Sequence, residues 1–274
     1  MSKFADKITE QIRVKPGTKP ALKKIDQRDV DFLGPEKDAR ARFDEDVVAI
    51  DALQDHMFSD GSKSLLVILQ GTDTSGKDGT IRAVFSKTSP LGMSVNGFKK
   101  PNDLELSHDF LWRVHAACPR RGSIGIFNRS HYEDVLIGKV RKLAPKEIIE
   151  QRYDQINAFE KLLVESGTTV LKFMLHISKK EQGERLRDRL DDPTKNWKFN
   201  PADLEDRGLW DDYQAAYEVA LARCSTKHAP WYVVPADRKW ARNVIIAAIV
   251  RDTLENMGLK YPKMPWKPSD FKID

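Results

Sequence analysis

The stretch from Ser64 to Thr80, SLLVILQGTDTSGKDGT, constrains the fold of this chain more than any other part of the sequence. Leu65 to Leu69 form a continuous apolar run with the length of a strand that is buried on both faces. The run leads into Gly71–Lys77, which has the spacing G-x-x-x-x-G-K, and a helical pattern follows from Thr80 to Lys87. A strand, a glycine-containing loop and a helix in this order predict a phosphate-binding loop, or P-loop.

The residues of this loop indicate which anion it binds. Gly71 and Gly76 allow backbone conformations in which successive N–H groups point at phosphate oxygens, and Lys77 adds a positive charge. The next position, where a Ser or Thr would ordinarily bind magnesium, is Asp78. An extra carboxylate is unfavourable beside the phosphates of ATP, so we expect a magnesium-laden anion, with Asp73 and Asp78 available to the metal. The alternative interpretation is an ordinary glycine-rich turn.

Predicted strands and helices alternate along the whole chain, which favours an α/β fold. Because parallel strands need crossover connections, this order predicts a three-layer α/β/α architecture with a parallel five-stranded sheet and a helical lid. We expect an N-terminal arm over 1–45, the domain that contains the P-loop over 46–260 with its lid at about 179–200, and a C-terminal tail over 261–274. The strands are expected near 65–69, 93–98, 123–127, 168–175 and 231–234, and the main helices near 42–57, 80–87, 102–114, 145–165, 179–190, 210–221 and 238–257.

Composition narrows the function only a little. The chain has 274 residues, enough for one large domain, and no apolar run of membrane-spanning length. The N-terminal residues lack the apolar segment of a signal peptide, and two cysteines are too few for a disulfide framework, so we expect a cytoplasmic protein. Forty-six basic against 41 acidic side chains leave a net charge of +5, a weak indication of an anionic partner.

Two further segments carry polar residues suited to phosphate chemistry. The third predicted strand ends in a polar sequence, residues 128–134, where parallel sheets place their active sites. The predicted lid carries Arg185 and Arg189 four residues apart on one helix face, with Lys195 and Lys198 in the loop that follows. Phosphoryl transfer needs such cations together with magnesium ligands. Because acidic residues interleave with these cations, ordinary surface ion pairs remain the alternative.

Six sequence blocks in order resemble the polyphosphate kinase 2 family: GTDTSGKDGTIR (71–82), FLWRVH (110–115), IFNRSHYEDV (126–135), ERLRDRLDDPTKNWKF (184–199), LWDDY (209–213) and APWYVVPAD (229–237). The resemblance covers about residues 60–255 and implies a P-loop kinase-like fold related to thymidylate kinase. It also implies that Mg²⁺-bound inorganic polyphosphate is the phosphoryl donor and a nucleotide the acceptor. A homo-oligomer, often a tetramer, is implied as well. The NRSHYEDV block resembles the class III subgroup, which implies phosphorylation of AMP to ADP and of ADP to ATP.

The resemblance also implies roles for individual residues. The family's second motif usually contains Asp-Arg-Ser, whereas this chain has Asn128-Arg129-Ser130, so we expect Asp134 to replace the missing carboxylate as a metal ligand beside Asp73. The catalytic residues implied are Asp73, Lys77, Arg129, Asp134 and Arg189. The expected polyphosphate ligands are Gly76, Lys77, Asp78, Gly79, Arg129, Arg185, Arg189 and Lys198. The expected nucleotide ligands are Asp73, Phe98, Lys99, Arg113, Asn128 and Glu133.

Some alternatives stay open at this stage. Phe98 fits a hydrophobic core as well as a nucleobase contact. For His115 and His131 we favour structural hydrogen bonds, because an anionic phosphate acceptor needs no strong base. An ATP-dependent nucleoside monophosphate kinase of thymidylate-kinase type is the alternative enzyme, although Asp78 argues against it. A polyanion-binding module without catalysis is the alternative of another class. We expect neither nucleic acid nor a membrane as partner, since the basic residues are mixed with acids.

Overall fold

A single parallel sheet forms the centre of the protein. The computed structural model describes residues 3–273. Its five strands lie in the order β2-β3-β1-β4-β5 and all pair in parallel. Their bounds are β1 Ser64–Gln70, β2 Met93–Gly97, β3 Ile124–Asn128, β4 Thr168–His176 and β5 Trp231–Pro235. The prediction of a five-stranded parallel sheet is therefore confirmed.

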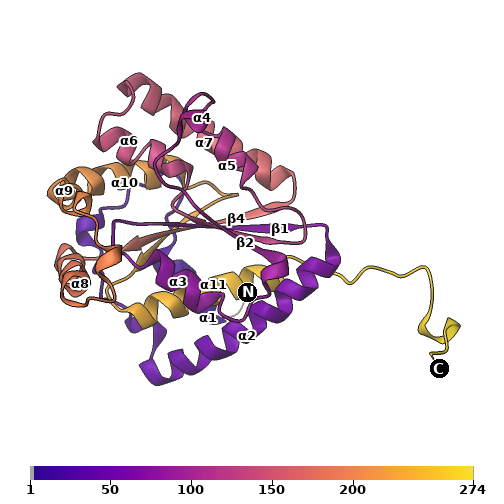
Figure 1. The fold of residues 1–274 in the computed structure, drawn as a ribbon. Coiled ribbons are helices and arrows are strands. Elements are labelled where there is room, and N and C mark those ends of the chain that lie inside the picture. Colours follow the sequence, from indigo (N-terminus) through magenta and orange to yellow (C-terminus); the bar gives the residue numbers. More distant parts are fainter. Residues whose placement is uncertain (1–2, 274) are drawn as a thin grey trace.

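Helices cover both faces of the sheet (Figure 1). One face carries α1 (Lys3–Ile12), α2 (Glu36–Asp60), α3 (Lys77–Val84) and α11 (Lys239–Asn256). The other carries α4 (Asp103–Leu106), α5 (Trp112–Ala116), α6 (Ile137–Val140), α7 (Lys146–Glu165) and α10 (Trp210–Cys224). Beyond one end of the strands lie α8 (Lys179–Asp191) and α9 (Ala202–Gly208). Six short 3-10 helices complete the described chain: η1 (Leu22–Lys24), η2 (Asp31–Leu33), η3 (Pro90–Gly92), η4 (His131–Asp134), η5 (Asn196–Lys198) and η6 (Pro268–Asp270).

Strand β1 holds the two hydrophobic layers together. Leu65, Val67 and Leu69 pack into the core on the α2–α11 side, whereas Leu66 and Ile68 pack on the opposite side. Every residue of β1 is buried, as the uninterrupted apolar run predicts. Because β3 and β4 pair with β1 on either side, the loop that follows β1 lies at the centre of the carboxyl edge.

Several helices differ from the sequence prediction: α1, α6 and α9 were not predicted, and the helix expected over 80–87 is α3, Lys77–Val84. The helix expected over 42–57 extends from Glu36 to Asp60. Asn102 and Glu105 form a capping box, but the helix that it starts ends at Leu106, so the expectation of one helix over 102–114 is wrong. The Asp109 carboxylate accepts a hydrogen bond from the Leu111 backbone N–H at 2.9 Å, which forms a turn before α5 begins.

The two ends of the described chain differ in how they lie against the core. Ile8 and Ile12 of α1 are buried in the core, and the Val14 backbone N–H bonds the Trp231 carbonyl at 2.9 Å. The residues after α11 extend away from the sheet (Figure 1). No helix within residues 3–273 combines the length and the apolar character needed to cross a membrane.

Candidate active site

A cleft of about 650 Å³ lies where the loops after β1 and β3 meet. It is bordered by the P-loop, the ends of β2 and β3, the α8–η5 segment with the start of α9, and the start of α11. Most of the residues predicted from the sequence line this cleft: Asp73, Gly76, Lys77, Asp78, Gly79, Phe98, Lys99, Asn128, Arg129, Arg185, Arg189 and Lys198. The structure therefore brings together groups that lie up to 125 positions apart in the sequence.

The P-loop backbone has the strained conformation that its glycines permit. Gly76 has φ +101° and directly precedes α3, and Thr74 has φ +62° although it carries a side chain. The Lys77 ammonium donates to the Gly71 carbonyl at 2.8 Å and to the Thr72 carbonyl at 3.3 Å. Burial, helped by the nearby charge of Arg129, lowers the pKa of Lys77 to about 8.

Arg185 supports the P-loop instead of presenting donors to the cleft. All five of its N–H groups are engaged: one donates to the Glu181 carboxylate at 2.8 Å and four to backbone carbonyls. Those carbonyls belong to Thr74, Ser75, Ala236 and Asp237, at 2.8 to 3.2 Å. The expectation that Arg185 binds polyphosphate is therefore corrected, because no N–H of this guanidinium is left for a ligand.

Arg242 of α11 is a second cation behind the loop. It is 3 % exposed and donates to the Ser75 carbonyl at 3.2 Å, and a Cβ atom on Gly76 would collide with its guanidinium. Burial, helped by the charge of Arg185, lowers the pKa of Arg242 to about 10. The sequence analysis missed Arg242 and its neighbour Lys239, which also lines the cleft.

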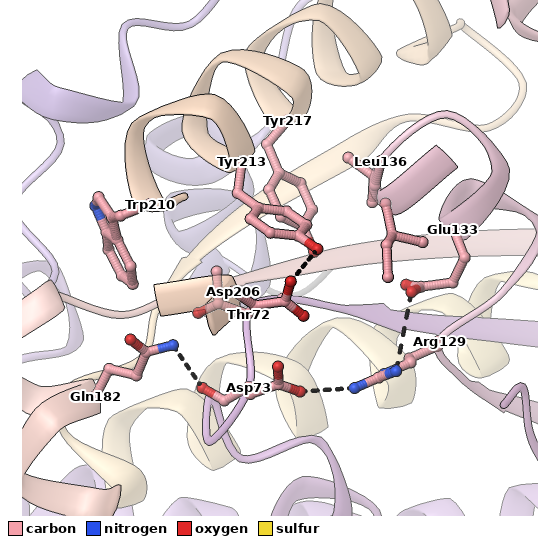
Figure 2. A pocket seen from close by; sticks show the side chains of 12 residues that line it. Thr72, Asp73, Arg129, Glu133, Leu136, Gln182, Asp206, Trp210, Tyr213 and Tyr217 are labelled. Atoms are coloured by element: carbon pink, nitrogen blue, oxygen red, sulfur yellow. Dashed lines mark hydrogen bonds and ion pairs between the residues drawn. The ribbon is translucent and has the colours of Figure 1, made fainter. Parts of the chain in front are cut away.

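Asp73, Arg129 and Glu133 form a chain of charges in which Asp73 and Arg129 line the cleft (Figure 2). The Arg129 guanidinium lies 2.6 Å from the Asp73 carboxylate and 4.0 Å from that of Glu133. Burial alone would lower the pKa of Arg129, but these two carboxylates raise it above its ordinary value. The Gln70 amide donates to Glu133 at 2.9 Å. This chain connects the end of β1 with the turn after β3.

Asn128 makes a specific contact across the cleft. Its side-chain amide donates a hydrogen bond to the Asp78 carboxylate. A carboxylate in place of Asn128 would put two negative charges at this short separation, which is unfavourable without a cation between them. The Asn at this position therefore fits a P-loop that carries Asp78.

The α8–η5 segment contributes cations from the other side. Arg189 donates to the Lys198 carbonyl at 3.0 Å and to the Asp203 carboxylate at 3.2 Å. Burial, helped by the negative charge of Asp73, raises the pKa of Asp203 to about 6. The Nε and Nη2 groups of Arg189 donate no hydrogen bond within the described part of the chain, so they are available to a ligand in the cleft.

A narrow pocket of about 40 Å³ adjoins the cleft and shares Asp73 and Arg129 with it. Figure 2 shows the rings of Trp210, Tyr213 and Tyr217 on one side of this pocket. The Tyr213 hydroxyl donates to the Asp206 carboxylate at 3.0 Å. The sequence analysis predicted this helix but named none of the three aromatic residues as a site residue. A stripe at helical spacing does not distinguish a core face from a pocket wall.

Two predicted site residues lie outside both pockets. The Asp134 carboxylate is 3.2 Å from the Arg152 guanidinium, and burial raises its pKa. Arg113 donates to the Lys99 carbonyl at 2.9 Å and lies over the Phe98 ring. Asp134 thus does not join Asp73 at the cleft, and the predicted pair of metal ligands is not formed. Within residues 3–273 no group of three His, Cys, Asp or Glu side chains is arranged to hold a metal ion.

The fold and the site define the class of protein: a P-loop α/β protein of the kinase type, whose cleft is built to bind phosphate groups. A family model described as Polyphosphate kinase 2 matches residues 35–262. The chain therefore belongs to the polyphosphate kinase 2 family, as its sequence blocks predict, and it is a phosphotransferase.

Similar proteins agree with this assignment. The AMP/ADP-polyphosphate phosphotransferase of Meiothermus ruber is 46 % identical over 93 % of this chain and 96 % of its own length. The ADP-polyphosphate phosphotransferase of Rhodopseudomonas palustris is 40 % identical over 93 % of this chain and 92 % of its own. The crystal structure of Polyphosphate Kinase 2 from Arthrobacter aurescens matches with a TM-score of 0.93 and 41 % identity, over 98 % of this chain and 96 % of that one.

The pKa of Lys77 predicts how polyphosphate binding depends on pH. Below about pH 8 the side chain is protonated and positive, and above this pH it loses its charge. We expect the affinity of the free enzyme for polyphosphate, measured by calorimetric titration, to decrease as the pH rises from 7 to 9.5. A Lys77→Arg variant, which stays charged, should not show the decrease. Equal affinity of the wild type at both ends of this range would contradict the assignment.

The two lid arginines are predicted to respond differently to replacement. Arg185→Met should lower the free energy of unfolding by about 3 kcal/mol or more, because it leaves buried partners unsatisfied. Arg189→Met should change stability by less than about 1 kcal/mol but should weaken polyphosphate binding. Denaturant unfolding and polyphosphate titration of both variants check this. The assignment fails if Arg185→Met is as stable as the wild type.

Proposed function

We propose that the protein transfers the terminal phosphoryl group of inorganic polyphosphate to AMP and to ADP, which yields ADP and then ATP. The observation that carries the proposal is the uneven charge of the cleft. Nine Lys and Arg side chains line it against four Asp side chains, an excess equal to the net charge of +5 of the whole chain. The named activities of the Meiothermus ruber and Rhodopseudomonas palustris relatives support the same donor.

The position of the cations favours a path for the polyphosphate chain. Arg189, Lys195 and Lys198 come from the α8–η5 segment, and Lys239 and Arg242 from the start of α11. Both groups of cations lie on one side of the P-loop, and the ends of β2 and β3 lie on its other side. A long polyanion can contact several of them at once, whereas the phosphates of a single nucleotide would leave part of this charge without a partner. The polyphosphate therefore occupies this half of the cleft.

The acceptor nucleotide occupies the other half, beside Phe98, Lys99 and Asn128. The Phe98 ring is 8 % exposed and packs edge-on against Phe127, so it belongs mainly to the core and offers only its rim to a ligand. Asp73 and Arg129 line both pockets and lie between the two halves. The transferred phosphoryl group is thus placed near these two residues and Lys77.

The reaction needs positioning and charge stabilisation more than proton transfer. A terminal phosphate oxygen of AMP or ADP attacks the terminal phosphorus of the polyphosphate in line. The new P–O bond forms as the bond to the next phosphate breaks, and the shortened polyphosphate leaves as an anion. Lys77 and Arg129 neutralise the negative charge on the transferred group and on the leaving chain.

The acidic residues of the cleft fit a magnesium ion bound together with the substrate. Mg²⁺ commonly takes one or two carboxylates and completes its shell with water and substrate phosphates. Asp73 and Asp78 both line the cleft and offer such oxygens, and Asp134 does not line it. We therefore assign the ion to Asp73 and Asp78 in place of the pair predicted from the sequence. When bound, it would neutralise charge on the phosphate oxygens.

An ATP-dependent nucleoside monophosphate kinase is the alternative donor assignment. Asp78 directly follows Lys77, at the position where ATP-binding P-loops carry a Ser or Thr hydroxyl for magnesium. This residue argues against ATP as donor.

We also propose a cytoplasmic location, because both cysteines are free thiols. We further propose a homo-oligomeric state. Recovery of the protein in an oxidising compartment after cell fractionation would contradict the proposed location. A molecular mass equal to that of one chain, measured by light scattering, would contradict the proposed homo-oligomer.

An assay without ATP tests the function. Purified protein with AMP, Mg²⁺ and polyphosphate should form ADP first and ATP later, measured by chromatography. Asp73→Asn should slow the reaction by about 10²-fold or more, because the variant loses a charged group at the site of transfer. Asp134→Asn, the matched change at a carboxylate outside the cleft, should keep most of the activity. Absence of product with polyphosphate, together with product from ATP, would replace this proposal by the alternative.

A further inference from the structure

The segment that follows β3 presents its first and fifth residues to the site and the three between them to the core. Arg129 and Glu133 line the narrow pocket, whereas Ser130, His131 and Tyr132 are at most 1 % exposed. Arg129 has φ +64°, a left-handed conformation that costs a side-chain-bearing residue about 1–2 kcal/mol. Such a conformation persists only where the surroundings determine it, so the anchor of this segment decides where the Arg129 guanidinium lies.

The anchor is a buried polar network. Lys172 of β4 and Glu160 of α7 form an ion pair in which both side chains are fully buried. The Lys172 ammonium also donates to the Tyr132 hydroxyl at 2.9 Å and to the Cys224 carbonyl at 2.7 Å. The Tyr132 hydroxyl donates to Glu160 at 2.8 Å. The network therefore joins β4, α7, α10 and the turn that carries Arg129.

Within the network, Lys172, Glu160 and Tyr132 all have hydrogen-bond partners for their polar atoms. The three N–H bonds of Lys172 are all used, and the Tyr132 hydroxyl both donates and accepts. The His131 Nε2 atom lies 3.3 Å from the same Glu160 carboxylate. These bonds among Lys172, Glu160 and Tyr132 disfavour small displacements, since a shift would leave a buried charge with fewer hydrogen bonds.

The ion pair itself is not needed for stability, because well-packed apolar residues of similar size stabilise a core as well as a buried ion pair does. Its specific effect is to fix the hydroxyl group of Tyr132, which lies three residues after Arg129 in the chain. We propose that Tyr132, held by the Glu160–Lys172 ion pair, is a positioning residue that fixes the left-handed turn at Arg129 and thereby aligns its guanidinium with the transferred phosphoryl group. This inference rests on the proposed function of the cleft.

Replacement of single hydroxyl groups tests the proposal. Tyr132→Phe removes the link but keeps the ion pair and the Cys224 contact. Tyr153→Phe is the matched control: Tyr153 is also fully buried in the same core cluster, and its hydroxyl has no hydrogen-bond partner among the described residues. We expect Tyr132→Phe to lower kcat for AMP phosphorylation by about tenfold or more through misalignment, with KM for polyphosphate nearly unchanged. Tyr153→Phe should retain the wild-type kcat.

A double-mutant cycle separates positioning from a general loss of structure. If Tyr132 acts through Arg129, Tyr132→Phe should lower kcat far less in an Arg129→Lys background than in the wild type. Effects that simply multiply would overturn the inference, as would a Tyr132→Phe enzyme as active as Tyr153→Phe. Both of these outcomes leave the proposed function intact. A wild-type enzyme inactive with polyphosphate would instead overturn the proposed function and this inference with it.

Discussion

The backbone carbonyls of the P-loop are bound by cations, and the rest of the site depends on this. Arg185 and Arg242 both donate to the Ser75 carbonyl, and Lys77 donates to the Gly71 carbonyl. Because a trans peptide is planar, a carbonyl held on one side directs the N–H of the next residue to the other. The two guanidiniums therefore orient the Gly76 N–H away from themselves. They come from α8 and α11, so the loop is held by helices distant in the sequence.

In the free protein, groups of the protein itself pair with the cations of the cleft. Arg129 forms an ion pair with Asp73, and the Lys77 ammonium donates to a backbone carbonyl. The pKa of Lys77 is about 8. A bound polyanion favours the protonated form of Lys77 and competes with Asp73 for Arg129. Under the proposed function, binding of the donor would in this way free the Asp73 carboxylate, which could then hold Mg²⁺.

Much of the fold and part of the site follow from the sequence because the signals are local. The apolar run of β1 and the glycine spacing of the P-loop lie within one short stretch, and both are confirmed. Arg242 could not be found in this way, because it lies in a helix whose pattern is dominated by buried apolar residues and reaches the P-loop only through the fold.

The errors have equally specific causes. Asp134 was placed at the cleft by its distance from Asn128 in sequence, but the left-handed residue Arg129 and the 3-10 turn η4 direct it toward Arg152. Arg185 has the same residue type and helix face as Arg189. The sequence does not show that the Glu181 carboxylate and the backbone carbonyls of two loops use all the donors of Arg185. Nor does it show that Nε and Nη2 of Arg189 stay available.

The most direct test of the central claim is a crystal structure of the protein with Mg²⁺ and a short polyphosphate. The account predicts a phosphate against the Gly76 backbone N–H and the Lys77 ammonium, with the chain continuing toward Lys198 and Lys239. A polyphosphate bound elsewhere, with Lys77 still on the Gly71 carbonyl, would contradict the account.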